Sequence, residues 1–324
     1  MTIRTGLLGR GMAGTVFHAP LIRAVAGFEL AAVAGSADAA ALIADPSIAL
    51  IVVATPNLSH FPLARAALLA GKHVVVDKPF TVTIAESDSL IALARERERV
   101  LTVFHNRRWD GDFLTVRDLI VSGRLGEPIL FEAHWDRFRP AIKQGWREVP
   151  ADGAGLLSDL GPHMIDQALL LFGGPDAVSA DIAVQRPQAA VDDYFELCLH
   201  YGARRVVLAA STLVAAPRPR FAVHGTGGSF VKYGLDAQEQ SLRDGRPPPP
   251  DEHPGRLTAP DGTTERIATL PGSYASFYQA VAAAIRDGAP GPVDPADARA
   301  GLALIDLARR SAREGRRISL PAAS

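Results

Sequence analysis

Short apolar segments alternate with amphipathic ones along the first third of the chain. Five runs rich in apolar and β-branched residues have the length of strands and lie at residues 3–8, 28–34, 51–54, 73–77 and 101–105. Segments with helical spacing of apolar residues separate them, at residues 12–26, 58–70 and 84–98. Strands buried on both faces read as near-continuous apolar runs, and parallel neighbours need a crossover connection. The order therefore predicts an α/β fold with a parallel, doubly wound sheet.

The pattern changes after about residue 104. Strand-like segments, several with period-two alternation, lie at residues 129–135, 178–185, 194–201, 206–211 and 220–224. Helical spacing is found only at residues 113–122, 161–171 and 274–287 and in a last helix that begins near residue 294. Strands that follow one another with few helices between them predict a C-terminal α+β domain with an open, mostly antiparallel sheet. We place the boundary between residues 106 and 107, and interpret the proline-rich stretch 245–260 as a long surface loop.

The composition excludes several classes of protein. Of the 324 residues, 48% are hydrophobic and 21% charged, and Lys plus Arg (34) nearly equals Asp plus Glu (35). A nucleic-acid binder would show a basic excess, so we expect no nucleic-acid partner. No apolar run reaches the ~18 residues of a membrane helix, and the first residues lack the features of a signal peptide. The nine histidines form no metal-ligand pair, so we expect no metal site.

The chain contains a single cysteine, Cys198. One cysteine excludes a disulfide framework and indicates a reducing compartment, so we expect a cytoplasmic protein. Because Cys198 lies in an alternating, strand-like segment, we interpret it as a small buried hydrophobic residue rather than a nucleophile.

The turn after the first predicted strand has the pattern Gly-x-Gly-x-x-Gly. It comprises Gly9, Arg10, Gly11, Met12, Ala13 and Gly14. Between a strand and a helix, the first glycine permits a tight turn, the second removes a side chain where a pyrophosphate approaches, and the third lets helix and strand pack closely. Exposed amides and the helix dipole then hold the phosphates. The alternative is an ordinary glycine-rich turn, but position and context favour a Rossmann-type site for NAD or NADP.

In such sites, the residue at the end of the second strand contacts the adenosine ribose of the cofactor. An acidic residue there binds the ribose hydroxyls and repels a 2′-phosphate. This chain has Ser36 at the tip and Asp38 slightly further on, and Arg10 can pair with a 2′-phosphate. The pattern therefore favours NADP slightly over NAD, with a simply solvated Arg10 as the alternative.

The segment after Ser36 is unusually short. Only about a dozen residues separate it from the next strand, where a common Rossmann domain has a helix, a third strand and a further helix. One short helix fits, at residues 39–44. We predict that the usual third strand is absent and that the second strand becomes an edge of the sheet.

Several motifs together resemble the Gfo/Idh/MocA oxidoreductases, the relatives of glucose–fructose oxidoreductase and inositol dehydrogenase. In chain order they are residues 55–60 (TPNLSH), 71–74 (GKHV), 77–79 (DKP) and 159–166 (DLGPHMID). The resemblance covers nearly the whole chain, and segments 17–21, 104–110 and 161–163 are most similar to the branch of NADP-linked scyllo-inositol dehydrogenases. This chain has Asp77 where the family most often has Glu. Substrates vary within the branch, so the resemblance does not identify one.

Lys78 follows a strand and precedes Pro79, at the rim where open α/β sheets bind ligands. An ammonium group there polarises a ketone or stabilises an alkoxide during hydride transfer. A cis bond between Lys78 and Pro79 would aim the ammonium inward. A surface lysine before a turn is the alternative, but the resemblance implies a catalytic Lys78.

Asp159 and His163 are spaced i, i+4 and face the same way if their segment is helical. The imidazole can accept a proton from a hydroxyl as hydride leaves, and Asp159 can orient the imidazole or a substrate hydroxyl. A histidine near a helix start is often a structural partner instead. The order of Asp, Gly, His and Asp is similar to that of the family and implies a catalytic pair, with Asp166 behind it.

Further residues are expected around the cofactor. Residues at the ends of strands would surround the nicotinamide ribose, and they are Thr55, Pro56, Asn57, His60 and Pro79. His60 begins a predicted helix, so a capping role is the alternative for it.

Other residues are expected around the substrate. Asn106 and Arg108 can hydrogen-bond vicinal hydroxyls and Trp109 can stack on a sugar face, although a structural elbow explains them equally well. Trp146 is a further candidate for the substrate pocket. Weaker candidates are Arg147, Glu148, Asp193, Tyr194, Lys232 and Tyr233.

The sequence therefore predicts a NAD(P)-dependent dehydrogenase or reductase of a sugar- or cyclitol-like hydroxyl or ketone. Residues 1–106 would bind the dinucleotide, and residues 107–324 would bind the substrate and form the oligomer. Two alternatives stay open: an enzyme that cleaves glycosides with bound NAD and no net redox change, and a cofactor-sensing regulator without catalysis. The resemblance implies a homodimer or homotetramer.

Overall fold

Two compact units make up the described part of the chain. The computed structural model describes residues 2–142, 148–151, 153–247, 249 and 253–320. By internal contacts, the first unit comprises residues 1–109, 237–249 and 273–302, and the second comprises residues 110–236, 250–272 and 303–324. The chain thus passes between the units more often than a single boundary at residue 106 allows. Periodicity could not reveal this, because it shows that a helix has an apolar face but not which core that face covers.

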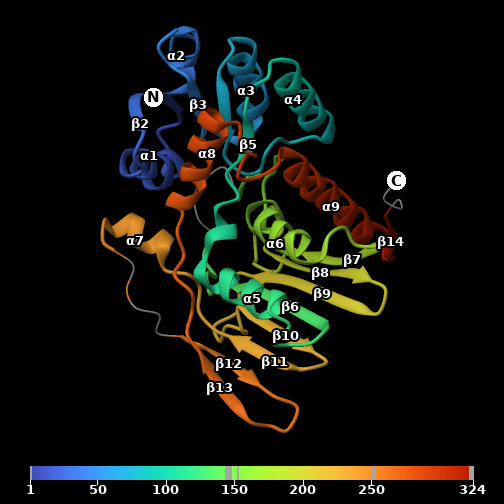
Figure 1. The fold of residues 1–324 in the computed structure, drawn as a ribbon. Helices are drawn as coiled ribbons and strands as arrows, with labels where there is room; N and C mark the ends of the chain where they lie inside the picture. Colours follow the sequence, from blue (N-terminus) through green and yellow to red (C-terminus); the bar gives the residue numbers. More distant parts are fainter. Residues whose placement is uncertain (1, 143–147, 152, 248, 250–252, 321–324) are drawn as a thin grey trace. The chain divides into compact units, whose positions relative to one another are not determined.

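A five-stranded parallel sheet forms the centre of the first unit (Figure 1). The strand order is β2-β1-β3-β4-β5, with bounds Phe28–Ala34, Ile3–Leu8, Leu50–Val53, His73–Val76 and Leu101–Val103. Every neighbouring pair is parallel. All four residues of β3 are buried, which explains its uninterrupted apolar sequence. The predicted parallel α/β sheet is confirmed.

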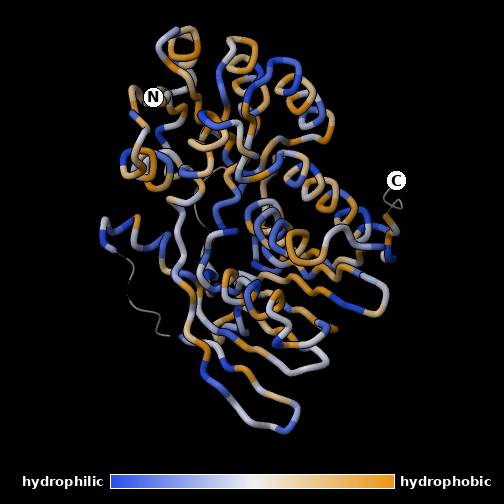
Figure 2. The backbone as a smooth tube through the Cα atoms, in the orientation of Figure 1, coloured by the Kyte–Doolittle hydropathy of each residue, from blue (hydrophilic) through white to orange (hydrophobic). Residues whose placement is uncertain are grey.

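Helices connect the strands and cover both faces of this sheet. α1 (Ala19–Ala24) contacts β2 and α8 (Ala275–Asp287), whereas α3 (His60–Leu69) contacts β4 and α4 (Ile84–Glu96). Right-handed crossovers put the connection from β1 to β2 on one face and the later connections on the other. Hydrophilic and hydrophobic residues are mixed along α4 (Figure 2), as expected for a helix with one buried face.

The connection from β2 to β3 is short, as predicted. It contains a 3₁₀ turn (Ser36–Asp38) and one helix, α2 (Ala39–Ala44), and β2 lies at the edge of the sheet. The buried Lys72 fastens the end of this connection, because its ammonium donates to the carbonyls of Asp45 at 2.7 Å and Ile48 at 2.8 Å. The missing third strand is therefore replaced by a loop that a lysine from the next connection holds in place.

The helix predicted at residues 12–26, with a disturbance at Pro20, is divided in the structure. A π-helix (Ala13–His18) follows the glycine-rich turn, and α1 begins directly after it. Pro20 stands in the first turn of α1, where its missing N–H costs least. The π-helical turns therefore end at the position where Pro20 favours the first turn of an α-helix. Single π-turns often occur at functional sites.

A nine-stranded sheet forms the centre of the second unit (Figure 1). Its order is β13-β12-β11-β10-β6-β9-β8-β7-β14. In chain order the bounds from β6 to β14 are Pro128–Asp136, Ala177–Ala183, Tyr194–Tyr201, Arg204–Ser211, Phe221–Gly225, Gly228–Lys232, Gly255–Thr258, Thr264–Ile267 and Ile318–Ser319. Within this sheet, β6 and β9 form the only parallel pair among the described strands, so the predicted mostly antiparallel sheet is confirmed.

The prediction for residues 245–260 was wrong in part. β12 lies within this stretch, and β11, β13, β14 and helix α7 (Gln238–Asp244) were also missed. β12 has four residues and pairs with β11 on one side and β13 on the other. Such short strands depend on their neighbours for stability, so their own sequence carries little signal.

Three helices complete the second unit. α5 (Gly111–Val121) contacts β10, and α6 (Leu156–Phe172) contacts β8 and β9. α9 (Pro295–Glu314) starts in the first unit, and its later part packs on the second, where Ser311 Oγ accepts from the Ala180 N–H at 3.1 Å. α6 begins before the predicted Gly161 and continues through Pro162. Asp159 and His163 therefore both lie in its first turns.

Candidate active site

The glycine-rich turn of the first unit has no room for side chains at two of its glycines. Gly9 has a φ of 128°, and a Cβ there would lie 2.2 Å from the Ala54 carbonyl oxygen. A Cβ on Gly14 would lie 2.1 Å from the Gly9 carbonyl oxygen. The turn after β1 is therefore packed against the end of β3 and against its own helix, the close approach for which such glycines are required.

Gly11 differs from these two glycines. It is exposed, and a Cβ there would meet no atom within 4 Å. The turn thus presents an open backbone surface at the start of a helix, with Met12 and Ala13 beside it. This surface fits a dinucleotide pyrophosphate, which needs close approach to amides and a helix N-terminus.

Arg10 and Asp38 face each other beside the edge strand β2. An Arg10 guanidinium nitrogen lies 3.6 Å from an Asp38 carboxylate oxygen, and both side chains are about two-thirds exposed (65% and 63%). The same guanidinium donates to the Val33 carbonyl at 3.5 Å. The side chain of Ser36 lies outside the described part of the structure. Arg10 thus makes only long, exposed contacts, and it lies where the sequence predicts the 2′-phosphate of NADP.

The rim at the end of β3 is held by hydrogen bonds. Ser59 donates to Pro56 O at 2.6 Å or to Thr55 Oγ1 at 2.8 Å, and Asn57 is buried. His60 is 1% exposed, with Nδ1 2.8 Å from the Pro79 carbonyl oxygen and Nε2 2.9 Å from that of Thr55. Both ring nitrogens of His60 thus face main-chain oxygens of the rim.

Lys78 lies at the end of β4, on the same edge of the sheet as the glycine-rich turn. The side chain is half-buried, and the Lys78–Pro79 peptide bond is cis. The main-chain N–H of Lys78 donates to Asp77 Oδ1 at 2.8 Å. The carboxylate of Asp77 therefore fixes the backbone of the residue that carries the ammonium.

A buried cluster behind Lys78 was missed by sequence reasoning. His18, from the π-helix, has Nδ1 2.6 Å from the Tyr278 hydroxyl and Nε2 4.0 Å from Asp77 Oδ1. Burial lowers the pKa of His18 to about 4, the charge of Asp77 acting in the opposite sense. Burial, and after it Asp77, raises the pKa of Tyr278 well above its usual value. The motif at residues 17–21 had pointed to this histidine but not to its partners.

The segment after β5 is built into the first unit. Arg108 pairs with Asp297 at 2.9 Å, and the Trp109 ring meets Phe277 edge-on at 5.7 Å between centroids. The Trp109 carbonyl accepts from the Gln238 side chain at 3.0 Å, and Asn106 is 4% exposed. This geometry fits the structural elbow that was the alternative to substrate binding.

In the second unit, α6 carries Asp159 and His163 one turn apart. Asp159 is half-buried, and His163 is 6% exposed, with its ring 6.2 Å from that of Trp135 on β6 at an interplanar angle of 30°. The two rings are thus neighbours in a tilted arrangement. Asp159 and His163 thus lie on one helix at the expected i, i+4 spacing, and Asp166 is buried one turn further on.

A buried guanidinium supports this ring pair, and the sequence did not indicate it. Arg220 is 2% exposed and lies 4.9 Å from the centre of the Trp135 ring. It donates to Gln167 of α6 at 3.0 Å and lies 3.5 Å from the Asp112 carboxylate. Arg220 thus connects three elements, at sequence separations that no local pattern reveals.

A second ion network lies near the start of α6. Arg186 pairs with Asp193 and with Glu148, both at 2.8 Å. Burial acts to raise the pKa of Asp193, but hydrogen bonds from Gln185 and Arg186 outweigh burial and lower this pKa. Glu148 and Asp193, weak substrate candidates by sequence, therefore have structural partners. Trp146 and Arg147 lie outside the described residues.

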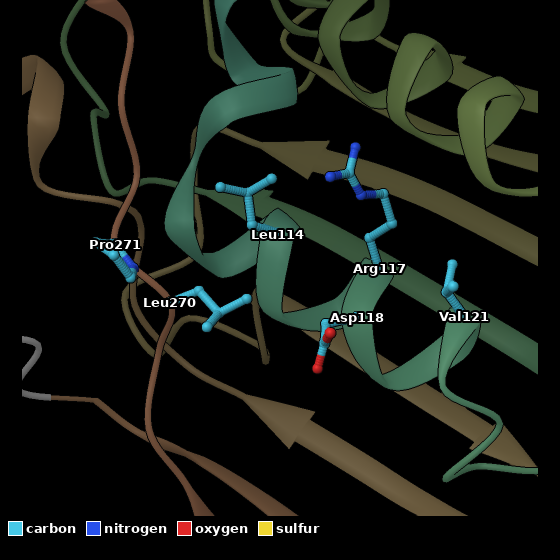
Figure 3. Close-up of a pocket in the computed structure, with 6 residues that line it drawn as sticks. All are labelled: Leu114, Arg117, Asp118, Val121, Leu270 and Pro271. Atoms are coloured by element: carbon cyan, nitrogen blue, oxygen red, sulfur yellow. The ribbon is translucent and has the colours of Figure 1, made fainter. Parts of the chain in front are cut away.

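The remaining weak candidates occupy ordinary structural positions. Tyr194 begins β8, Tyr233 is exposed, and the Lys232 ammonium donates to the His253 carbonyl at 2.6 Å. A surface pocket of the second unit lies elsewhere, on α5, and its lining residues are Leu114, Arg117, Asp118, Val121, Leu270 and Pro271. Figure 3 shows the first four on α5 and the other two on the segment that passes alongside it. None of the predicted site residues lines this pocket.

Comparison with known families identifies both parts of the chain. Residues 33–105 match the NAD-binding Rossmann fold of an oxidoreductase family, and residues 117–320 match its C-terminal alpha/beta domain. The chain belongs to the Gfo/Idh/MocA oxidoreductase family. The glycine-rich turn precedes the matched range, so its geometry is independent support for a nicotinamide cofactor. This family member is therefore a NAD(P)-binding oxidoreductase.

Relatives of this family member cover almost its whole length. It is 46% identical to the oxidoreductase YdgJ of Escherichia coli K12, over 96% of each chain. It is 38% identical to the scyllo-inositol 2-dehydrogenase (NADP(+)) IolW of Bacillus subtilis, over 98% of this chain and 96% of the relative. The fold is similar to that of the oxidoreductase YvaA of Bacillus subtilis, with a TM-score of 0.95, 38% identity and 99% of each chain covered. In the part of the chain that the structure describes, no helix is both long and apolar enough for a membrane span.

Proposed function

We propose that this chain is a dehydrogenase or reductase that moves hydride between NADP or NAD and a sugar- or cyclitol-like hydroxyl or ketone. One observation carries the proposal. The glycine-rich turn follows β1 and Lys78 follows β4, and only β3 separates these strands in the sheet. Carboxyl ends of parallel strands meet at one edge, where open α/β sheets bind ligands. The relative named scyllo-inositol 2-dehydrogenase supports the substrate class.

The cofactor supplies the site of hydride exchange when it is bound. Gly9, Arg10, Gly11, Met12, Ala13 and Gly14 are proposed to hold its pyrophosphate. Thr55, Pro56, Asn57, Lys78 and Pro79 are proposed to border the nicotinamide side of the site. Arg10 and Ser36 are proposed to favour the 2′-phosphate of NADP, because Ser36 and not an acidic residue stands at the tip of β2 and Arg10, 3.6 Å from the carboxylate of Asp38, lies beside it.

Lys78, Asp159 and His163 are proposed to handle the proton. The ammonium of Lys78 stabilises negative charge on the reacting oxygen, and His163 accepts the hydroxyl proton during oxidation and returns it during reduction. Asp159, one turn before His163 on α6, orients the imidazole or a neighbouring substrate hydroxyl. Asn106, Arg108 and Trp109 stay as weaker substrate-binding proposals because their side chains have structural partners.

The first experiment compares binding of NADPH and NADH to the purified chain by nicotinamide fluorescence. The preferred cofactor is then used in a turnover screen of polyols and keto-sugars that includes scyllo-inositol. We expect tighter binding of NADPH and an absorbance change at 340 nm that matches product formed. The Lys78→Met variant should still bind cofactor but lose about 10³-fold in kcat, because a charge that stabilises the transition state is gone.

Two results would favour the other candidate functions. A cofactor that stays bound with no net absorbance change while a glycoside is cleaved would indicate the reaction without net redox. Cofactor binding without turnover on any polyol would indicate a regulator. Wild-type turnover by Lys78→Met would contradict the roles given to the site residues.

We also propose self-association through the second unit as a dimer or tetramer. The alternating sequence of β8 supports this, because one face is buried and the other face, apart from the exposed Glu196, carries the partly buried Tyr194, Cys198 and His200. Light scattering coupled to size exclusion tests it, and a monomer at micromolar concentration would contradict it.

A further inference from the structure

His60 joins two main-chain segments that border Lys78. Its ring lies with Nδ1 2.8 Å from the Pro79 carbonyl oxygen and Nε2 2.9 Å from the Thr55 carbonyl oxygen. Thr55 follows the end of β3, and Pro79 directly follows Lys78 beyond β4. The imidazole therefore links the carboxyl ends of two neighbouring strands, and one of its two attachment points is the residue next to Lys78.

The chemistry of the two contacts is unusual for a buried histidine. Both partners are carbonyl oxygens, which only accept hydrogen bonds. A neutral imidazole has one N–H and bonds one of them, whereas an imidazolium donates to both. The ring is 1% exposed, so water cannot replace a lost bond at little cost. Both ring nitrogens thus have a main-chain acceptor within hydrogen-bond distance, and the two contacts together fix the orientation of the ring.

The other side of Lys78 is also fixed. The Lys78 N–H donates to Asp77 Oδ1 at 2.8 Å, so the backbone of Lys78 is tied on one side by Asp77 and on the other by His60 through Pro79. The titratable groups around His60 are Asp77 and Lys78 beyond β4, His18 of the π-helix, and Tyr278 behind His18. These groups come from three elements of one unit.

We infer that His60 is a positioning residue for Lys78. By holding the Pro79 carbonyl to the Thr55 carbonyl, it sets the direction in which the Lys78 ammonium leaves the rim. This rests on the proposed function of Lys78, and it replaces the direct cofactor contact expected for His60 from the sequence. A small displacement of a catalytic group costs far more in turnover than in binding.

The test compares His60→Phe, which keeps the ring and removes both nitrogens, with His60→Gln, which keeps one donor group. The matched control is His73→Phe, at the amino end of β4 and thus at the opposite edge of the sheet, where Nδ1 accepts from the Val100 N–H at 3.0 Å. We expect His60→Phe to lose about 10- to 100-fold in kcat while KM for cofactor changes less than about threefold. His60→Gln should lie between wild type and His60→Phe, and His73→Phe should keep wild-type kcat.

A second measurement does not depend on turnover. The chain has four lysines, Lys72, Lys78, Lys143 and Lys232, so reductive ¹³C-methylation gives few NMR signals. The Lys78 signal is the one that disappears in Lys78→Met. We expect its pH titration midpoint to shift in His60→Phe and His60→Gln and to stay in place in His73→Phe. If His60→Phe fails to fold, His60→Gln gives the same comparison.

The outcomes separate this inference from the proposed function. Wild-type kcat and an unchanged Lys78 titration in His60→Gln or His60→Phe, with Lys78→Met inactive, would overturn the role of His60 alone. An active Lys78→Met would overturn the proposed function. If Lys78 and His60 both have the roles given to them, the double variant Lys78→Met with His60→Phe should have the same kcat as Lys78→Met alone. The reason is that His60 acts through Lys78.

Discussion

The two units hold their candidate catalytic residues by different means. In the first unit, contacts to main-chain carbonyl groups hold the site in place. Gly9 packs against the Ala54 carbonyl, and His60 binds two carbonyl oxygens beside Lys78. In the second unit, side chains hold His163, with Trp135 against its ring and the buried Arg220 against Trp135. Main-chain support depends on short motifs within one sheet edge. Side-chain support depends on residues that only the folded sheet brings together.

The largest effect should come from the second unit. We expect His163→Gln to lose about 10²- to 10⁴-fold in kcat, the usual contribution of a general acid or base, with little change in cofactor affinity. Trp135→Leu should show a smaller loss than His163→Gln. An equal or greater loss would mean that the ring pair matters more than the base.

Removing the buried cation should destabilise the second unit strongly. Arg220→Met leaves Asp112 buried without this ion pair, at a cost of about 3–5 kcal/mol in the free energy of unfolding. Urea unfolding followed by circular dichroism measures this. The double variant Arg220→Met with Asp112→Leu should recover part of the loss, since the buried charge is then gone as well. No recovery would show that Arg220 acts mainly by packing on Trp135.

Two glycine variants sharpen the account of the first unit. In Gly9→Ala the new methyl group meets the Ala54 carbonyl at 2.2 Å, so we expect a loss of about 2–4 kcal/mol in stability. In Gly11→Ala the methyl group meets no atom, so the melting temperature should hold while NADPH binding weakens. Calorimetry and nicotinamide fluorescence separate the two effects. Unchanged NADPH affinity in Gly11→Ala would place the pyrophosphate elsewhere.

The buried His18 should make the protein sensitive to acid. Burial lowers its pKa from 6.5 to about 4, so the unfolded chain takes up the proton first as pH falls. The contribution to stability is complete above pH 6.5 and is lost on the way to pH 4, by about 3 kcal/mol. Urea unfolding of His18→Gln from pH 6.5 to 4 should show a correspondingly smaller decrease than wild type. Equal decreases would mean that His18 is not the responsible group.

The smallest effect concerns cofactor choice. Arg10→Ala should weaken NADPH binding about tenfold and leave NADH binding nearly unchanged, because a charge-assisted contact to the 2′-phosphate is lost. Arg65→Ala, on α3, serves as a surface control. Equal weakening of both cofactors would assign Arg10 to the pyrophosphate instead.

Sequence reasoning succeeded where the signal was local. Buried strands read as apolar runs, the glycine spacing matched the packing at Gly9 and Gly14, and the short segment after Ser36 correctly predicted β2 as an edge strand. It failed for the four-residue strand β12 and for α7, which depend on their neighbours. It also could not show that both ring nitrogens of His60 face main-chain oxygens, because a motif indicates that a residue matters but not which atoms surround it.

The sequence by itself determined the two sheet types, the glycine-rich turn and the positions of Lys78, Asp159 and His163 on a strand end and a helix. These follow from periodicity and from steric requirements of single residues, which act over a few positions of the chain. Only the tertiary structure decided which groups surround them. Arg220 lies 53 residues from Gln167 in sequence, and His18 lies 260 residues from Tyr278. Such pairs form because burial leaves each polar group few partners, and the fold alone selects which one is within reach.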